Sequence, residues 1–192
     1  MRVVLVLAAG RSRRFVGGNK LLAHAGGRPI LSRALAAARA APAARIIVVA
    51  GHDRARIARI ARGPRTSVVF AHDHPLGVSA SLRAGLAALW PIEREIFVFL
   101  GDMPAIPAAL PRRLARSLRP GDDAVRPRGR DGPGHPVLLR RPDRATVARL
   151  RGDRGLAGLI AGRTRWLTDN ARQPADIDTR RDLARSRPRR MR

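Results

Sequence analysis

The sequence predicts a three-layer α/β/α fold in which helices cover both faces of a mostly parallel sheet. Apolar runs of strand length recur along residues 1–100, and longer segments with helical spacing of apolar residues lie between them. Strands that alternate with helices imply right-handed β-α-β crossovers and parallel neighbours. A chain of 192 residues is long enough to bury a substantial core. We therefore expect a Rossmann-like sheet.

The first half of the chain has the clearest pattern. Four apolar runs predict buried strands over residues 3–7, 46–50, 67–71 and 96–100. Helices are predicted between them over residues 29–41, 53–61 and 79–90. Asp53 and Ser79 are residue types that cap helices, and we expect them to cap the second and third of these.

The second half is less regular. We predict a helix over residues 108–118, strands over residues 123–126, 135–139 and 164–168, and helices over residues 141–151, 156–161 and 179–185. Residues 127–134 combine Gly, Pro and Arg, which is typical of an exposed loop. We expect one domain over residues 1–184, followed by a basic, disordered tail over residues 185–192.

Composition excludes several functions. The chain has no cysteine, so it has neither disulfides, nor thiolate metal sites, nor a thiol nucleophile. Its formal charge of +25 attracts anions, but the arginines are scattered, and 3% aromatic residues supply few stacking platforms for single-stranded nucleic acid. Specific nucleic-acid binding is therefore disfavoured.

The first apolar run is too short to span a membrane and no cleavage site follows it, so we expect a soluble, cytoplasmic protein without membrane contact.

The loop after the first strand carries the first candidate site. Open α/β sheets bind ligands at the carboxyl ends of their strands. This loop begins with the small residues Ala8, Ala9 and Gly10, which let backbone amides face an anion, and Arg14 and Lys20 add positive charge. The pattern predicts a phosphate cradle, although it has neither the Walker A spacing nor the dinucleotide fingerprint.

Two further loops follow predicted strands. Asp102 comes directly after the most hydrophobic strand, where a carboxylate facing the basic loop suits a hard divalent cation. Its alternative interpretation is a turn or helix cap ahead of Pro104. Residues 75–86 contain Gly77 and Ser81 and begin a helix whose N-terminus suits a base or ribose edge.

Together these segments resemble the nucleotidyltransferase superfamily that includes the molybdenum-cofactor cytidylyl- and guanylyltransferases. The resemblance runs from Val3 to Leu183 and implies a fold of the nucleotide-diphospho-sugar transferase type. The pieces that carry it are Leu7-Ala8-Ala9-Gly10 with Ser12, Arg14 and Lys20, and Gly101-Asp102-Met103-Pro104. Residues 77–86, 134–138, 152–155, 176–179 and 182–183 resemble the cytidylyltransferase branch. Ala9 stands where a second glycine is typical of the guanylyl branch, which favours CTP over GTP.

The resemblance also implies residue roles. The triphosphate contacts map onto Ala8, Ala9, Gly10, Arg14 and Lys20, the nucleoside end onto Gly77 and Ser81, the magnesium ligands onto Asp102 and Asp178, and an acceptor contact onto His135. Asp178 is preferred over Asp176 as the second metal ligand. The sequence departs from the family pattern at Val16, where a glycine is usual, and at Arg180-Arg181, which replace Pro-Glu and add positive charge near Asp178.

The implied reaction moves CMP from CTP to a phosphorylated acceptor, molybdopterin, with Mg²⁺ and release of pyrophosphate. Lys20, Arg14 and Asp102 are the implied catalytic residues, acting by alignment and charge neutralisation. A phosphate nucleophile is already ionised, so no general base is expected. A molybdoenzyme or its chaperone is the implied protein partner. We interpret His72 and His74 as solvated loop residues rather than metal ligands.

Alternatives remain open from the sequence. They are guanylyl transfer to the same cofactor, transfer to a sugar or alditol phosphate, a relative recruited for redox work on a small heterocycle, and, from a different class, a basic nucleic-acid-binding protein. The sequence identifies neither the acceptor nor the oligomeric state.

Overall fold

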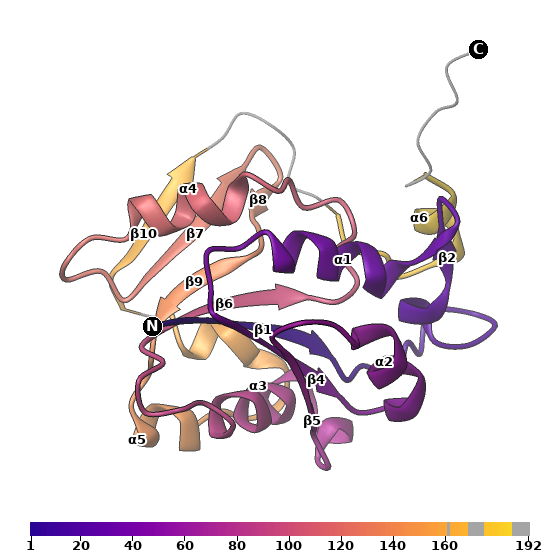
Figure 1. The fold of residues 1–192 in the computed structure, drawn as a ribbon, viewed down its shortest axis with the longest axis horizontal. Helices are drawn as coiled ribbons and strands as arrows, with labels where there is room; N and C mark the ends of the chain where they lie inside the picture. The colour runs from indigo at the N-terminus through magenta and orange to yellow at the C-terminus, as the bar shows by residue number, and fades with distance from the viewer. Residues whose placement is uncertain (161, 169–174, 186–192) are drawn as a thin grey trace.

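The protein, described by a computed structural model over residues 1–160, 162–168 and 175–185, has three layers (Figure 1). A central mixed sheet has the strand order β10-β7-β9-β6-β1-β4-β5. The predicted three-layer α/β/α fold with a mostly parallel sheet is confirmed.

The centre of the sheet comes from the first half of the chain. Each predicted apolar run forms a strand here, and all these strands are parallel: β1 (Arg2–Ala8), β4 (Arg45–Ala50), β5 (Thr66–Phe70) and β6 (Glu95–Leu100). β1 lies between β4 and β6, so the strand order reverses beside β1. Loops that leave the sheet in opposite directions open a crevice at such a switch point.

Helices cover both faces of this sheet (Figure 1). One apolar cluster packs α1 (Ile30–Arg39), α2 (Arg54–Ala61) and α4 (Leu110–Ser117) on one face. A second cluster packs α3 (Val78–Ala87) and the segment around α5 (Arg144–Ala148) on the other. Buried strands with apolar side chains on both faces require this double cover. Among the described residues no helix combines the length and apolarity needed to cross a membrane.

The second half of the chain extends the sheet with one reversed strand. β9 (Val137–Arg140) is antiparallel to both β6 and β7 (Ala124–Gly129), and β10 (Thr164–Thr168) is parallel to β7. The predicted loop 127–134 is instead the end of β7, a turn at Arg130 and Asp131, and β8 (Gly132–Pro133), in which Gly132 has a φ of 106°.

Other predictions of this half need correction. The helix expected over residues 141–151 is limited to α5, and the one expected over 156–161 is replaced by the 3-10 segment η3 (Gly152–Gly158), with residue 161 outside the described part. The last predicted helix is confirmed as α6 (Arg180–Arg185). The predicted tail lies outside the described residues from 186 onward.

Both predicted helix caps are wrong. Asp53 precedes α2 with a left-handed φ of 58°, and its side chain caps nothing; Asp53 Oδ2 instead accepts a hydrogen bond from Asn19. Ser79 lies inside α3, and its hydroxyl accepts a hydrogen bond from the Gly155 amide. In both cases the side chain that the local pattern assigned to a helix cap forms its hydrogen bond with a residue distant in sequence instead.

Candidate functional site

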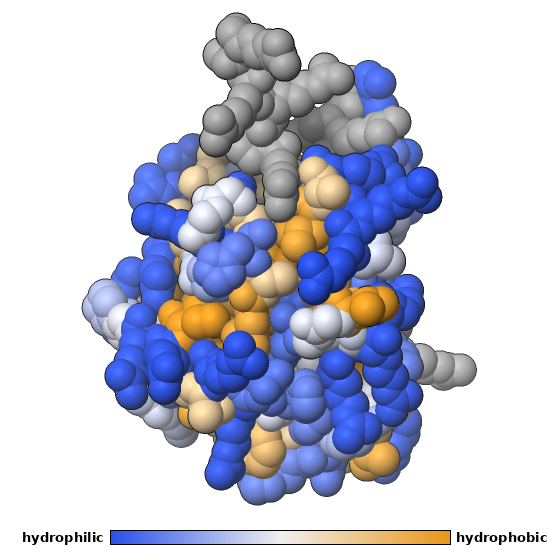
Figure 2. Space-filling view, turned by 90° about the vertical axis from the view of Figure 1, so that its right-hand side faces the viewer, coloured by the Kyte–Doolittle hydropathy of each residue, from blue (hydrophilic) through white to orange (hydrophobic). Residues whose placement is uncertain are grey.

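A cavity of about 630 Å³ lies at the carboxyl ends of the central strands. Figure 2 looks onto this face and shows apolar side chains framed by hydrophilic ones. All the residues that the sequence assigned to nucleotide binding line the cavity: Ala8, Ala9, Gly10, Arg14, Lys20, Gly77 and Ser81. Asp102 and Asp178 line it as well. The structure therefore brings these loops together as the switch point requires.

The loop between β1 and η1 (Lys20–Leu22) is held by its own side chains. Ser12, with a φ of 53°, accepts a hydrogen bond from the Lys20 amide, and its hydroxyl donates to Asn19 Oδ1 at 3.2 Å. Asn19 Oδ1 also accepts from the Leu21 amide at 3.0 Å, while Asn19 Nδ2 donates to Asp53. The buried Asn19, which the sequence analysis did not single out, therefore fixes the point from which Lys20 projects.

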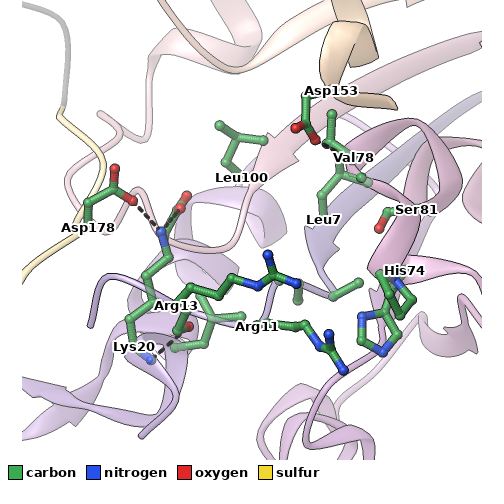
Figure 3. Close-up of a pocket in the computed structure, with 18 of the residues that line it drawn as sticks. Leu7, Arg11, Arg13, Lys20, His74, Val78, Ser81, Leu100, Asp153 and Asp178 are labelled. Carbon is green, nitrogen blue, oxygen red and sulfur yellow. Dashed lines mark hydrogen bonds and ion pairs between the residues drawn. The ribbon is translucent and has the colours of Figure 1, made fainter. Parts of the chain in front are cut away.

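Lys20 forms the centre of an ion-pair network (Figure 3). Its ammonium lies 2.6 Å from Asp102 Oδ2 and 2.7 Å from Asp178 Oδ1, and Arg14 lies 2.6 Å from Asp178 Oδ2. Burial alone lowers the pKa of Lys20, but the charge of Asp102 and the hydrogen bonds to both carboxylates outweigh burial and raise the pKa above its ordinary value. Lys20 is therefore cationic at neutral pH.

The carboxylates Asp102, Asp176 and Asp178, which we call the carboxylate cluster, can direct oxygens to within 4.8 Å of one another. Asp102 Oδ1 is buried and has no hydrogen-bond partner. An oxygen-only donor set with an unpartnered buried oxygen fits a hard divalent cation. The sequence selected Asp178 over Asp176, whereas the structure brings both within reach of Asp102.

A segment from the end of the described chain supplies two members of this cluster. Ile177 is buried in a small core with Phe15, Ala25, Ile30 and Leu183, and its amide donates to the Asp102 carbonyl at 3.1 Å. Arg180, one of the family departures, donates to the Val16 carbonyl, and its guanidinium lies over the Phe15 ring. Its charge is thus directed at the loop rather than at the cluster.

The opposite wall comes from the start of α3 and from η3. Gly77 has a φ of 108°, and a Cβ there would lie 2.7 Å from the Gly152 carbonyl oxygen, so a side chain is excluded. Asp153 Oδ1 accepts a hydrogen bond from the Val78 amide at 3.3 Å and lines the cavity. Figure 3 shows Asp153 and Asp178 on separate sides of the opening. No role was predicted for Asp153 itself from the sequence.

Three more lining residues were missed. Arg11 and Arg13 belong to the β1–η1 loop and were recognisable as further cations in it. His74 corrects an interpretation, because it lines the cavity and its Nδ1 is buried without a partner, whereas His72 is exposed. Burial, followed by the charges of Arg11 and His52, lowers the pKa of His74. His74 is therefore a neutral polar group in the wall.

His135, the predicted acceptor contact, is not among the residues that line this cavity. It is partly buried, with a cis bond to Pro136, and its Nδ1 has no partner. Burial, followed by the charge of Arg126, lowers its pKa to about 4, while the charge of Asp176 acts in the opposite direction. His135 thus lies on the Asp176 side of the site, outside the cavity.

Comparisons with known proteins converge on one family. Residues 4–170 match the family described as MobA-like NTP transferase domain. The crystal structure of Rv0371c from Mycobacterium tuberculosis H37Rv is 32% identical, with 96% of each chain covered and a TM-score of 0.83. A complex of Rv0371c with manganese is 30% identical, covering 96% of this chain and 97% of the other with a TM-score of 0.82.

A curated relative matches over a shorter stretch. The bifunctional protein GlmU of Rhizorhabdus wittichii is 32% identical over 142 residues, which cover 73% of this chain and 29% of GlmU. The chain therefore spans less than a third of the length of that relative.

Proposed function

We propose that this chain, which belongs to the MobA-like NTP transferase domain family and is a nucleotidyltransferase, transfers CMP from CTP to molybdopterin and releases pyrophosphate. The observation that carries the proposal is the cavity at the switch point, with a cationic loop along one side and the carboxylate cluster beside it. Phosphate groups and a metal ion that neutralises them need this combination.

The carboxylate cluster would hold the metal ion. We assign Mg²⁺ to Asp102 and Asp178, and the proximity of Asp176 makes it a third candidate ligand. The unpartnered oxygen of Asp102 supports this assignment, as do the donors, which are all oxygens. When bound, the ion neutralises charge on the phosphate oxygens. The manganese complex of Rv0371c is consistent with a divalent ion in a related protein.

The residues of the β1–η1 loop would hold the triphosphate. Arg14 and Lys20 provide cations, and the backbone around Ala8, Ala9 and Gly10 provides close approach because these residues are small. Fixed cations favour the charge that builds up on the departing pyrophosphate. Asn19 and Ser12 hold the loop in advance, so the alignment costs little reorganisation on binding.

The remaining contacts are assigned by position. Ser81 lies across the cavity from Asp178 (Figure 3), and Gly77 lines the same cavity; both would face the nucleoside. His135, on the Asp176 side, remains our candidate for an acceptor contact. The acceptor phosphate is already ionised at neutral pH, so no residue needs to remove its proton. A molybdoenzyme or its chaperone is the partner expected to receive the product.

The first competing function is transfer to another phosphorylated acceptor. The family resemblance also admits a sugar phosphate or an alditol phosphate as acceptor, and the residues of the β1–η1 loop do not exclude GTP. Ala9 supports CTP through the resemblance alone, because a second glycine at this position is typical of the guanylyl branch. A nucleic-acid-binding role is disfavoured because the family match and the cavity account for the basic loop.

A pyrophosphate-release assay tests the proposal. CTP, GTP, ATP and UTP are offered in turn with Mg²⁺ and molybdopterin. We expect release with CTP alone. Release with GTP alone would replace CMP transfer by GMP transfer. If a nucleotide binds but nothing is released with molybdopterin, the acceptor assignment is wrong, and sugar phosphates and alditol phosphates become the acceptors to test.

A further inference from the structure

We propose that Lys20 stands in for the divalent ion while the site is free of nucleotide, and that its transfer to the triphosphate opens the carboxylate cluster to the metal. Metal ion and nucleotide would then bind with positive cooperativity. The inference rests on the proposed function, because it assumes that the cluster holds a cation during turnover.

The position of the Lys20 ammonium carries the argument. It lies 2.6 Å from Asp102 Oδ2 and 2.7 Å from Asp178 Oδ1, so one cation bridges the two carboxylates that we assign to the metal. The side chains are mostly buried, with 13% of Lys20, 18% of Asp102 and 23% of Asp178 exposed. Such carboxylates would repel one another strongly without a cation between them.

The ammonium and a divalent ion compete for the same carboxylate oxygens, because both are cations that draw on the same negative charge. Lys20 occupies one oxygen of Asp102 and one of Asp178, and Arg14 occupies the other oxygen of Asp178. Only Asp102 Oδ1 is left buried and unpartnered in this network. A divalent ion that approaches also meets the charge of Lys20 in a site largely shielded from water. Metal binding therefore requires Lys20 to leave.

Lys20 can leave without disturbing its backbone. Its amide is fixed by Ser12, and the following amide of Leu21 is fixed by Asn19. The flexible four-carbon stem can therefore redirect the ammonium from the cluster into the cavity, which Lys20 already lines. Arg14 is even less constrained, since 76% of its side chain is exposed.

A triphosphate supplies the new partners that this movement needs. Without it, moving the Lys20 ammonium away from the carboxylates breaks two ion pairs and forms none in their place. With it, the ammonium exchanges carboxylate oxygens for phosphate oxygens, and the vacated oxygens become metal ligands. Each ligand then favours the conformation that the other requires, and thermodynamic linkage makes the effect reciprocal.

Mn²⁺ binding without nucleotide tests the inference directly. Free Mn²⁺ is measured by electron paramagnetic resonance in titrations of wild type, Lys20→Met and Arg13→Met. Arg13 is the matched control, because it lines the same cavity and no ion pair joins it to the carboxylate cluster within the described residues. Both variants lose one positive charge, so the net charge of the protein changes equally.

We expect Lys20→Met to bind Mn²⁺ at least about tenfold more tightly than wild type, and Arg13→Met to bind it within about twofold of wild type. Equal affinities in Lys20→Met and Arg13→Met would overturn the inference while leaving the metal site of the proposed function intact. Absence of Mn²⁺ binding in all three proteins at millimolar Mn²⁺ would instead remove the metal site itself. Thermal unfolding checks that the variants are folded.

A second measurement tests whether the gain in Mn²⁺ affinity arises at the carboxylate cluster. In the proposal, removing Lys20 removes the competition, so Asp102→Asn in the Lys20→Met background should abolish the gain in Mn²⁺ affinity. A gain that survives Asp102→Asn would show that Mn²⁺ binds elsewhere, and this result also contradicts the inference.

Discussion

The two ends of β6 carry two carboxylates with opposite roles. Glu93 precedes the strand and Asp102 follows it. Glu93 has no exposed surface, and both its oxygens are bonded: Arg45 donates to each of them at 2.9 and 2.8 Å, and the Trp90 amide donates to the second. The Arg45 guanidinium also lies 4.0 Å above the Trp90 ring. Both carboxylate oxygens at this end of β6 therefore have hydrogen-bond partners.

The Asp102 end is left incomplete. One oxygen contacts the ammonium of Lys20, and the other is buried without a partner. A buried polar atom without a partner costs free energy, which a ligand can recover by binding. The comparison shows that the hydrogen bonds and ion pairs of a carboxylate, more than its burial, distinguish a structural role from a ligand-binding role. A carboxylate with every oxygen bonded stabilises the fold, whereas one with a spare oxygen is available for a ligand.

The largest effect is expected at the incomplete end. Asp102→Asn keeps the shape but removes the charge that we assign to the metal, so pyrophosphate release should fall by at least about 10³-fold. The free energy of unfolding should decrease only slightly, because Lys20 keeps its ion pair with Asp178 and one Asp102 oxygen has no partner to lose. Retention of more than a tenth of wild-type turnover would contradict the metal assignment.

Removal of the Glu93 carboxylate should instead lower the stability of the protein and leave nucleotide binding unchanged. Glu93→Ala leaves Arg45 buried without its partner and should lower the free energy of unfolding by about 3 kcal/mol, measured by urea denaturation. The KM for the nucleotide should stay unchanged in the folded fraction. Glu95→Gln is the control, because Glu95 pairs with Arg2 at a partly exposed site and should cost less than about 1 kcal/mol. A large change of KM in Glu93→Ala would erase the distinction between the two ends.

His135 combines features of both ends, since it is partly buried and its Nδ1 has no partner. Its pKa is about 4 in the folded protein against 6.5 for a free histidine, so the folded state binds fewer protons between these values. Its contribution to stability is therefore complete above pH 6.5 and is lost as the pH falls towards 4. We expect a loss of about 2 kcal/mol, reduced by partial exposure.

The measurement is the free energy of unfolding as a function of pH for wild type and His135→Asn. The variant should lack this part of the pH dependence between 6.5 and 4, while the slopes at higher pH coincide. Parallel curves over the whole range would show that His135 has an ordinary pKa.

The smallest effect is expected for the loop that positions Lys20. Asn19→Ala removes the acceptor for the Leu21 amide and the donor to Asp53, at a cost of about 1 kcal/mol in unfolding free energy. Because Lys20 then projects from a looser loop, the KM for the nucleotide should rise by several fold with a smaller change in kcat. An increase confined to kcat would indicate that the loop limits product release instead.

Local pattern was sufficient for the centre of the fold. The apolar runs of the first half all form strands, since a buried strand needs apolar side chains on both faces. Pattern could not give the direction of β9, because a short apolar run reads the same in a parallel and an antiparallel strand. The caps assigned to Asp53 and Ser79 failed for a related reason, since their partners Asn19 and Gly155 lie far along the chain.

The sequence by itself determined the fold class, the family resemblance and the loops that meet in one cavity, because strand periodicity is local and the loops of a doubly wound sheet converge at one edge. Only the tertiary structure decided which charged side chains of the cavity pair with one another. The ion pairs of Lys20 depend on a segment anchored by Ile177 in a core with Phe15 and Leu183, and the wall at Asp153 depends on η3 packing against α3. Such packing joins residues distant in sequence, and no local spacing encodes it.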